Sequence, residues 1–145
     1  MTSRTKFIPL DLQTTLTPML AVRDEPRAIE FYKKVFGATE TTRMTDPSGK
    51  VSHCEVNIGG SPVMIADEFP EHNISPQSLG GSPVMIHLLV KNVDATFSLA
   101  VAAGAKVLRP VADQFHGNRN GKLVDPFGHI WMVATYKDDA SSRET

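Results

Sequence analysis

The feature that most constrains the fold is an internal repeat. Asp24 recurs as Asn92, and Met64 recurs as Met132, both at an offset of 68 residues. Solenoid units recur about every 20–50 residues, so this longer period indicates two copies of one small module. Two such modules can build a cavity between them. Equivalent positions in the two copies then indicate where a ligand would lie.

Each copy is predicted to contain a strand, a helix and three further strands. In the first copy, Asp24 can cap the helix, Pro26 lies in its first turn and Gly37 ends it. Residues 51–58 alternate apolar and polar side chains, which is typical of a half-buried strand. The expected strands are 16–22, 39–44, 51–58 and 62–66, then 83–90, 106–111, 119–124 and 130–135, with a second helix near 93–103.

The predicted fold class is therefore α+β. We expect two βαβββ modules whose curved, mixed or antiparallel sheets enclose a cavity, with the helices on the convex side. The expected organisation is an N-terminal extension (1–14), a first module (15–67), a linker (68–82), a second module (83–136) and a disordered polar tail (137–145).

Composition excludes several functional classes. The net charge is −1, and no run of lysine and arginine favours nucleic-acid binding. No stretch approaches the roughly 20 apolar residues that span a membrane, and the N-terminus lacks a signal-peptide pattern. The one cysteine, Cys54, cannot form an internal disulfide, which fits a reducing compartment. We expect a cytoplasmic protein with no nucleic-acid or membrane partner.

Two segments resemble a known family. They are Val-Arg-Asp-Glu-Pro-Arg-Ala-Ile-Glu-Phe-Tyr-Lys-Lys-Val-Phe-Gly-Ala at 22–38 and Asp-Pro-Phe-Gly-His-Ile-Trp at 125–131. With the paired modules, they resemble the glyoxalase/bleomycin-resistance/extradiol-dioxygenase superfamily, also called the vicinal oxygen chelate fold. Segments 115–121 and 78–83 are similar to its PhnB-like branch. The resemblance implies a fold but no single activity, because this superfamily contains lyases, dioxygenases, epimerases, antibiotic-modifying enzymes and binding proteins.

The resemblance also implies where a metal would bind. In metal-dependent members, the first strand of each module supplies His or Gln and the fourth supplies Glu. The family pattern and the internal repeat both assign these positions to Thr17, Met64, Met85 and Met132. None suits zinc, iron(II), manganese or nickel, which prefer imidazole, carboxylate or water oxygen. We therefore expect no metal and no other cofactor. The four side chains are predicted either to fill the core or to line an apolar ligand cavity.

Strand alternation predicts which polar side chains share that cavity. His87 lies two residues from Met85 and points the same way. His53 and Glu55 alternate with the apolar residues of their strand, and Arg119 is expected on the face of His53 through the 68-residue offset. The candidate catalytic residues are His53 or His87 as a general base, with Glu55 orienting it. Arg119 is the candidate for binding a ligand anion.

Each candidate has an alternative. The polar residues of strand 51–58 can line an exposed sheet face, and His87 can be a core histidine. Arg119 can instead pair with Asp113 or Asp125 and fix the last hairpin.

Three further residues are predicted to be structural. His129 and Trp131 have the parity opposite to Met132, so we expect them on the convex side, with Trp131 against Phe97. Cys54 is expected to be a small buried hydrophobe.

These patterns predict a metal-independent small-molecule-binding protein that sequesters or modifies an apolar or aromatic anionic ligand. The alternative is a divalent-metal-dependent lyase or dioxygenase in which His53, Glu55 and His87 hold a displaced ion. The linker is long enough for the modules to pair within one chain or between two chains. We expect a homodimer with cavities at the module interface.

Overall fold

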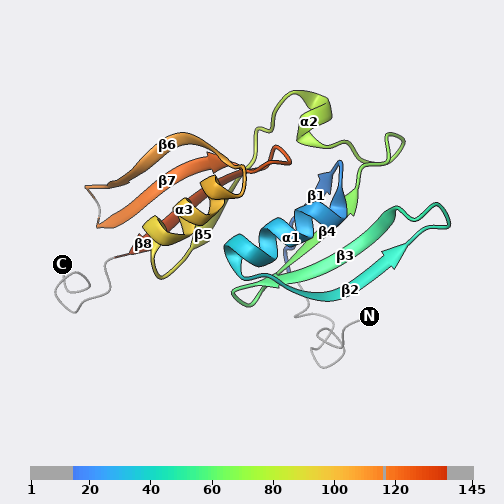
Figure 1. Ribbon diagram of the computed structural model, residues 1–145, viewed down its shortest axis with the longest axis horizontal. Coiled ribbons are helices and arrows are strands. Elements are labelled where there is room, and N and C mark those ends of the chain that lie inside the picture. The colour runs from blue at the N-terminus through green and yellow to red at the C-terminus, as the bar shows by residue number, and fades with distance from the viewer. Residues whose placement is uncertain (1–14, 116, 137–145) are drawn as a thin grey trace.

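The fold consists of two small sheets, each covered on one face by a long helix (Figure 1). The computed structural model describes residues 15–115 and 117–136, so the expected N-terminal extension and polar tail lie outside the described residues. The first module contains β1 (Met19–Val22), α1 (Glu25–Phe36), β2 (Thr39–Thr45), β3 (Val51–Ile58) and β4 (Ser61–Asp67). A short helix, α2 (Pro76–Leu79), precedes β5 (Met85–Leu89), α3 (Val93–Ala102), β6 (Lys106–Asp113), β7 (Asn118–Val124) and β8 (Ile130–Tyr136).

The two sheets have the same topology. Their strand orders are β1-β4-β3-β2 and β5-β8-β7-β6, with one parallel pair followed by two antiparallel pairs in each. The predicted α+β class and the two βαβββ modules are confirmed. The sheets are curved and open, and no strand pair joins one sheet to the other within residues 15–115 and 117–136.

Strand register reproduces the sequence repeat. In the first sheet Met19 pairs with Met64, and in the second His87 pairs with Met132. Both pairs are related by the 68-residue offset, so the parallel edge of each sheet is built in the same way.

The helix ends follow the sequence signals. The Asp24 side chain accepts a 3.3 Å hydrogen bond from the backbone N–H of Arg27, and Asn92 accepts a 3.1 Å bond from that of Ala95. Gly37 ends α1 with φ of 70°, a conformation that glycine adopts without steric cost.

Several element boundaries differ from the prediction, and one helix was not predicted. β1 begins at Met19, because Pro18 has no N–H to donate, although its carbonyl accepts from Met64 at 2.9 Å. The linker contains α2, which Ser75 caps and which was not predicted. β6 continues past Pro110 to Asp113, because it is an edge strand and proline is tolerated there.

One hydrophobic core joins the two modules. Trp131 is buried on the helix-covered face of its sheet, as predicted, and its ring packs on Phe36 at 4.5 Å and Tyr32 at 5.7 Å between centroids. Both partners belong to α1 of the other module, whereas the sequence pointed to Phe97 of α3. The tryptophan partner changes because the two modules pack together through their helix-covered faces.

None of the helices within residues 15–115 and 117–136 combines the length and the apolar character needed to cross a bilayer.

Candidate functional site

Each sheet has an open face on the side opposite its helix. In β1 and β5 the residues there include Met19, which is 59% exposed, Met85, which is 42% exposed, and Leu89, which is 54% exposed. Their neighbours along the strands point the other way, and Leu20 is a core residue with 5% exposure. We call these two surfaces the open faces of the first and second sheets.

Three of the four residues at the metal positions that the resemblance implies lie on the open faces. Met64 lies on the first, while Met85 and Met132 lie together on the second, with Met132 paired to His87. Thr17 lies just before β1 and is half-buried. The three methionines therefore lie on the faces opposite the helices, and their part in binding a ligand stays a prediction.

The predicted catalytic residues are divided between the sheets. His53 and Glu55 lie side by side on the open face of β3, since the alternating Cys54 and Val56 are fully buried under α1. His87 lies on the other sheet. Among residues 15–115 and 117–136, no three His, Cys, Asp or Glu side chains are arranged to hold a metal ion. One chain therefore does not bring these three residues together.

The placement of Arg119 on the cavity face is corrected. Its guanidinium makes two hydrogen bonds to Asp94 of α3, at 2.8 and 2.9 Å, and one to Asp113 at 3.3 Å. It therefore lies on the helix side of β7. These bonds raise the pKa of Arg119, while the guanidinium lowers the pKa of the Asp94 carboxyl. The alternative from the sequence, an ion pair with Asp113, is the one that the geometry supports.

The physical reason is a shift of one residue in the repeat. On the helix side of the third strands, Cys54 of β3 matches Gly121 of β7, which is an offset of 67 residues and not 68. A slip of one residue reverses the face of every side chain in a strand. The true counterparts of His53 and Glu55 are Asn120 and Lys122, which lie on the open face of the second sheet.

Arg109 is the cation that the sequence analysis missed. Its Nη2 donates a short hydrogen bond to Oδ1 of Asn120 and lies 4.0 Å from Sδ of Met132. Both partners are open-face residues, so the guanidinium lies there too. The register of β6 shifts on both sides of Arg109, so side chains in this strand do not alternate regularly between the two faces. Strand alternation therefore could not predict that Arg109 lies on the open face.

Two buried amides hold this cation. Asn118 and Asn120 are each 4% exposed, and the Asn120 Nδ2–H group donates to Oδ1 of Asn118 at 2.8 Å. Both asparagines belong to the segment 115–121 that resembles the PhnB-like branch. In this segment the sequence pattern had indicated Arg119 as the ligand-binding residue. The segment therefore contributes its asparagines to the open face of the second sheet.

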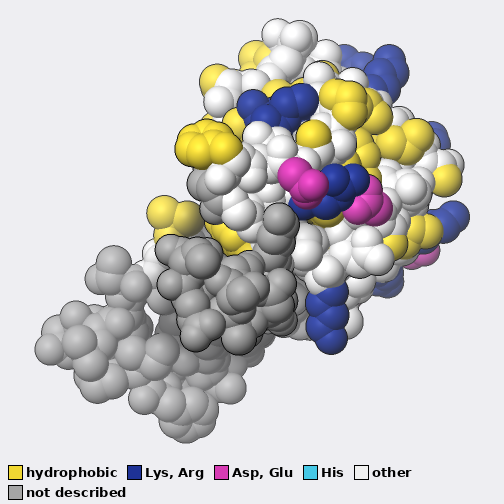
Figure 2. Space-filling view, turned by 90° about the vertical axis from the view of Figure 1, so that its left-hand side faces the viewer, with side chains coloured by type: hydrophobic (Ala, Val, Ile, Leu, Met, Phe, Trp, Pro, Cys, Tyr) yellow, Lys and Arg dark blue, Asp and Glu magenta, His cyan; other side chains and the backbone are white. Residues whose placement is uncertain are grey.

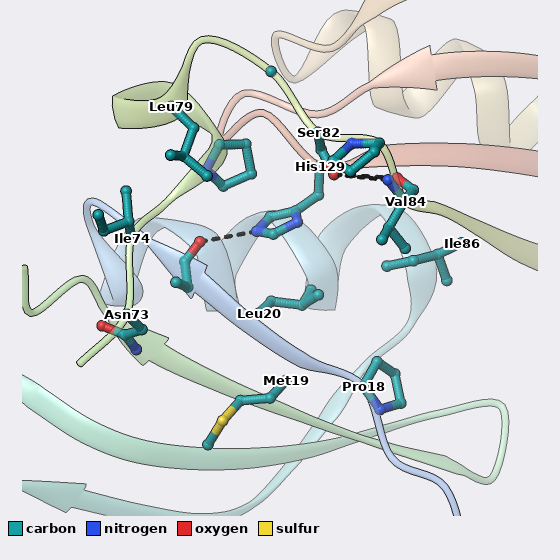
Figure 3. Close-up of a pocket in the computed structure, with 14 residues that line it drawn as sticks. Pro18, Met19, Leu20, Asn73, Ile74, Leu79, Ser82, Val84, Ile86 and His129 are labelled. Carbon is teal, nitrogen blue, oxygen red and sulfur yellow. Dashed lines mark hydrogen bonds between the residues drawn. The ribbon is translucent and has the colours of Figure 1, made fainter.

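A separate pocket of about 390 Å³ lies between β1, the linker and the start of β5 (Figure 3). The Nε2–H group of His129 donates to the carbonyl oxygen of Ala21 at 2.9 Å, which ties the second module to β1. None of the eight residues predicted as site residues is among the described residues of its wall. Those wall residues include Met19, Leu20, Asn73, Ile74, Leu79, Ser82, Val84 and Ile86.

Buried ionisable groups also lie in the first turn of α1 and beneath this helix. Burial raises the pKa of Glu25 and raises that of the Cys54 thiol to about 12. Nη2 of Arg43 lies 3.5 Å from Oε1 of Glu25. Cys54 is fully buried, as predicted, and at this pKa it is not a nucleophile near neutral pH.

The chain is similar to solved structures over most of its length. TioX from Micromonospora sp. is 27% identical, with a TM-score of 0.65 over 87% of this chain and 98% of that one. A gene product of Arabidopsis thaliana is 30% identical, with a TM-score of 0.64 over 85% of this chain and 99% of the other.

Sequence comparison gives the family. An uncharacterized protein of Mycobacterium tuberculosis is 44% identical over 128 residues, which are 86% of this chain and 75% of that protein. The profile of the Glyoxalase/Bleomycin resistance protein/Dioxygenase superfamily matches residues 14–133. This chain therefore belongs to the glyoxalase/bleomycin resistance protein/dioxygenase superfamily.

Proposed function

We propose that this chain binds a small apolar or aromatic anionic molecule, without a metal ion, in a cavity completed by two copies of the chain. The observation that carries the proposal is the pair of open faces. Each displays apolar side chains, among them Met19, Met85 and Leu89, opposite the helix-covered side. Exposed apolar surface that is rimmed by polar groups typically marks a ligand site or a protein interface.

Charge complementarity supports a second copy as the covering partner. The first open face carries Glu55, whereas the second carries Lys122. The helix-covered faces already share one core, so they are not free to bring the open faces together. In a two-fold dimer the first sheet of one chain would cover the second sheet of the other, and both cavities would be equivalent.

The chemistry of the donors supports binding without a metal. Thr17, Met64, Met85 and Met132 offer a hydroxyl and thioethers, and thioethers suit soft ions and apolar ligands. We also infer that the chain belongs to the PhnB-like branch and works in the cytoplasm. The likeness of segments 115–121 and 78–83 to that branch supports the first inference, and the buried free thiol of Cys54 supports the second.

The test combines mass in solution with binding of an uncharged apolar dye, N-phenyl-naphthylamine. We expect a mass of two chains at micromolar concentration and dye fluorescence that saturates. Leu89→Glu should give the mass of one chain and weaken dye binding, because it places a charge on the second open face. Leu99→Glu is the matched control, since Leu99 is 45% exposed on α3 and should change neither quantity. A monomeric wild-type protein, or saturable dye binding that Leu89→Glu leaves unchanged, would contradict the proposal.

Metal analysis of untagged protein tests the alternative enzyme. Stoichiometric zinc, iron, manganese or nickel that is lost in His53→Ala would identify a metal enzyme that uses His53, Glu55 and His87, and would overturn metal-independent binding.

A further inference from the structure

We propose that Arg109 is the residue that binds the ligand's anionic group, an oxyanion such as a carboxylate or sulfonate. This inference rests on the proposed function and assigns its charge recognition to one side chain. Nothing in the sequence pattern pointed to this residue.

The guanidinium is held in place before any ligand arrives. Asn118 and Asn120 are nearly fully buried, and they form a hydrogen-bonded chain that ends at Nη2 of Arg109. The same Nη2 lies beside Sδ of Met132. Two buried amides that orient one cation against a thioether form a prepared site for a ligand with an apolar body and a charged end.

The charge of Arg109 has no acidic partner in the part of the chain that the structure describes. No Asp or Glu oxygen of residues 15–115 and 117–136 lies within 4.0 Å of it. Its Nε is buried without a hydrogen-bond partner there. A buried N–H without an acceptor is unfavourable, and an oxyanion accepts strong hydrogen bonds from guanidinium.

A second cation reinforces the site. Lys122 of β7 is the direct cross-strand partner of Arg109 in β6. Like charges opposite each other destabilise a sheet, and an anion between or above them relieves this repulsion. The pair therefore indicates an anionic ligand and not merely an apolar one.

Arg119 shows the contrasting arrangement. Its guanidinium is engaged by Asp94 and Asp113 on the helix side of the same sheet. Figure 2, which views the molecule from the left-hand side of Figure 1, shows basic side chains next to acidic ones on the surface. Arg119 is therefore the matched control for loss of a positive charge.

The experiment uses two dyes that differ by one sulfonate group. Anilinonaphthalene sulfonate carries one sulfonate, and N-phenyl-naphthylamine is the same molecule without it. We expect Arg109→Gln to raise the dissociation constant of the sulfonate dye about ten-fold and that of the neutral dye less than about two-fold. Arg119→Gln should change neither, and higher ionic strength should weaken only the sulfonate dye.

The outcomes separate this inference from the proposed function. If wild-type protein binds neither dye, both fail. If both dyes bind and Arg109→Gln weakens them equally, or weakens neither, Arg109 does not recognise the anion and only this inference fails. The mass of Arg109→Gln is measured in parallel. A change from two chains to one would show that Arg109 serves the interface between copies, which also overturns the inference.

Discussion

The phenol of Tyr32 donates a 2.5 Å hydrogen bond to Oδ2 of Asp125, and this bond connects α1 of the first module with the β7–β8 turn of the second. The same carboxylate accepts from Nε1 of Trp131 at 2.9 Å and from the backbone N–H groups of Phe127 and His129 at 2.8 and 3.0 Å. The buried carboxylate is thus supplied with donors by both modules. The Asp125 carboxylate therefore links α1 of the first module to the β7–β8 turn of the second.

Tyr32→Phe should lower the free energy of unfolding by about 1–3 kcal/mol, because it removes a hydrogen bond from a buried carboxylate without changing the packed volume. Urea unfolding followed by Trp131 fluorescence measures this change. The only other tyrosine, Tyr136, is 50% exposed, so Tyr136→Phe should stay within about 0.5 kcal/mol. Equal effects of the two substitutions would contradict the role assigned to Tyr32.

The pH dependence of the same bond has a definite sign. Burial first, and then the charge and hydrogen bond of Asp125, raise the pKa of Tyr32 well above 10. A group whose pKa is higher in the folded state contributes stability fully below its unfolded value, and the contribution is lost as pH rises through the folded value. The stability difference between wild type and Tyr32→Phe should therefore be constant from about pH 7 to 9 and shrink above about pH 10. A difference that stays constant to pH 11.5 would refute this expectation.

Gly121→Ala should destabilise the second module. A Cβ at this position would lie 3.0 Å from the Phe97 ring, the Val111 side chain and the Val111 backbone nitrogen. Backbone atoms cannot move aside cheaply, so we expect a loss of about 1–3 kcal/mol in thermal or urea unfolding. Lys122→Ala, one residue further and on the opposite face, is the control and should cost less. Unchanged stability of Gly121→Ala would mean that β6 shifts to accommodate the methyl group.

The Cys54 thiol should react only when the protein unfolds. Its pKa of about 12 and complete burial leave a thiolate fraction on the order of 10⁻⁴ at pH 8. Ellman's reagent should therefore label no cysteine in the native protein. In roughly 6 M guanidinium chloride, which unfolds the chain, it should label one cysteine per chain. Rapid native labelling would show that α1 opens readily.

Much of the site could be predicted where strands are regular. Strand alternation predicted the shared face of His53 and Glu55 and the common direction of Met85 and His87, and both hold in β3 and β5. Prediction failed at β6 and β7. There the register shifts on either side of Arg109 and the offset changes by one residue. A slip of one residue reverses the face of each side chain that follows it. Strand alternation therefore cannot predict which side chains lie on the open face beyond the slip.

The sequence by itself determined the two modules, the element order within each module and the lack of conventional metal-ligand residue types at the positions that the family resemblance implies. Those properties depend on local pattern and residue chemistry, which one chain displays without its partners in space. Only the tertiary structure decided that α1 packs on Trp131 of the other module, that Arg119 pairs with Asp94, and that Arg109 lies beside Met132. These are contacts between distant segments. They depend on how strand register and helix packing align the side chains, and a shift of one residue is enough to exchange one arginine for another on the open face.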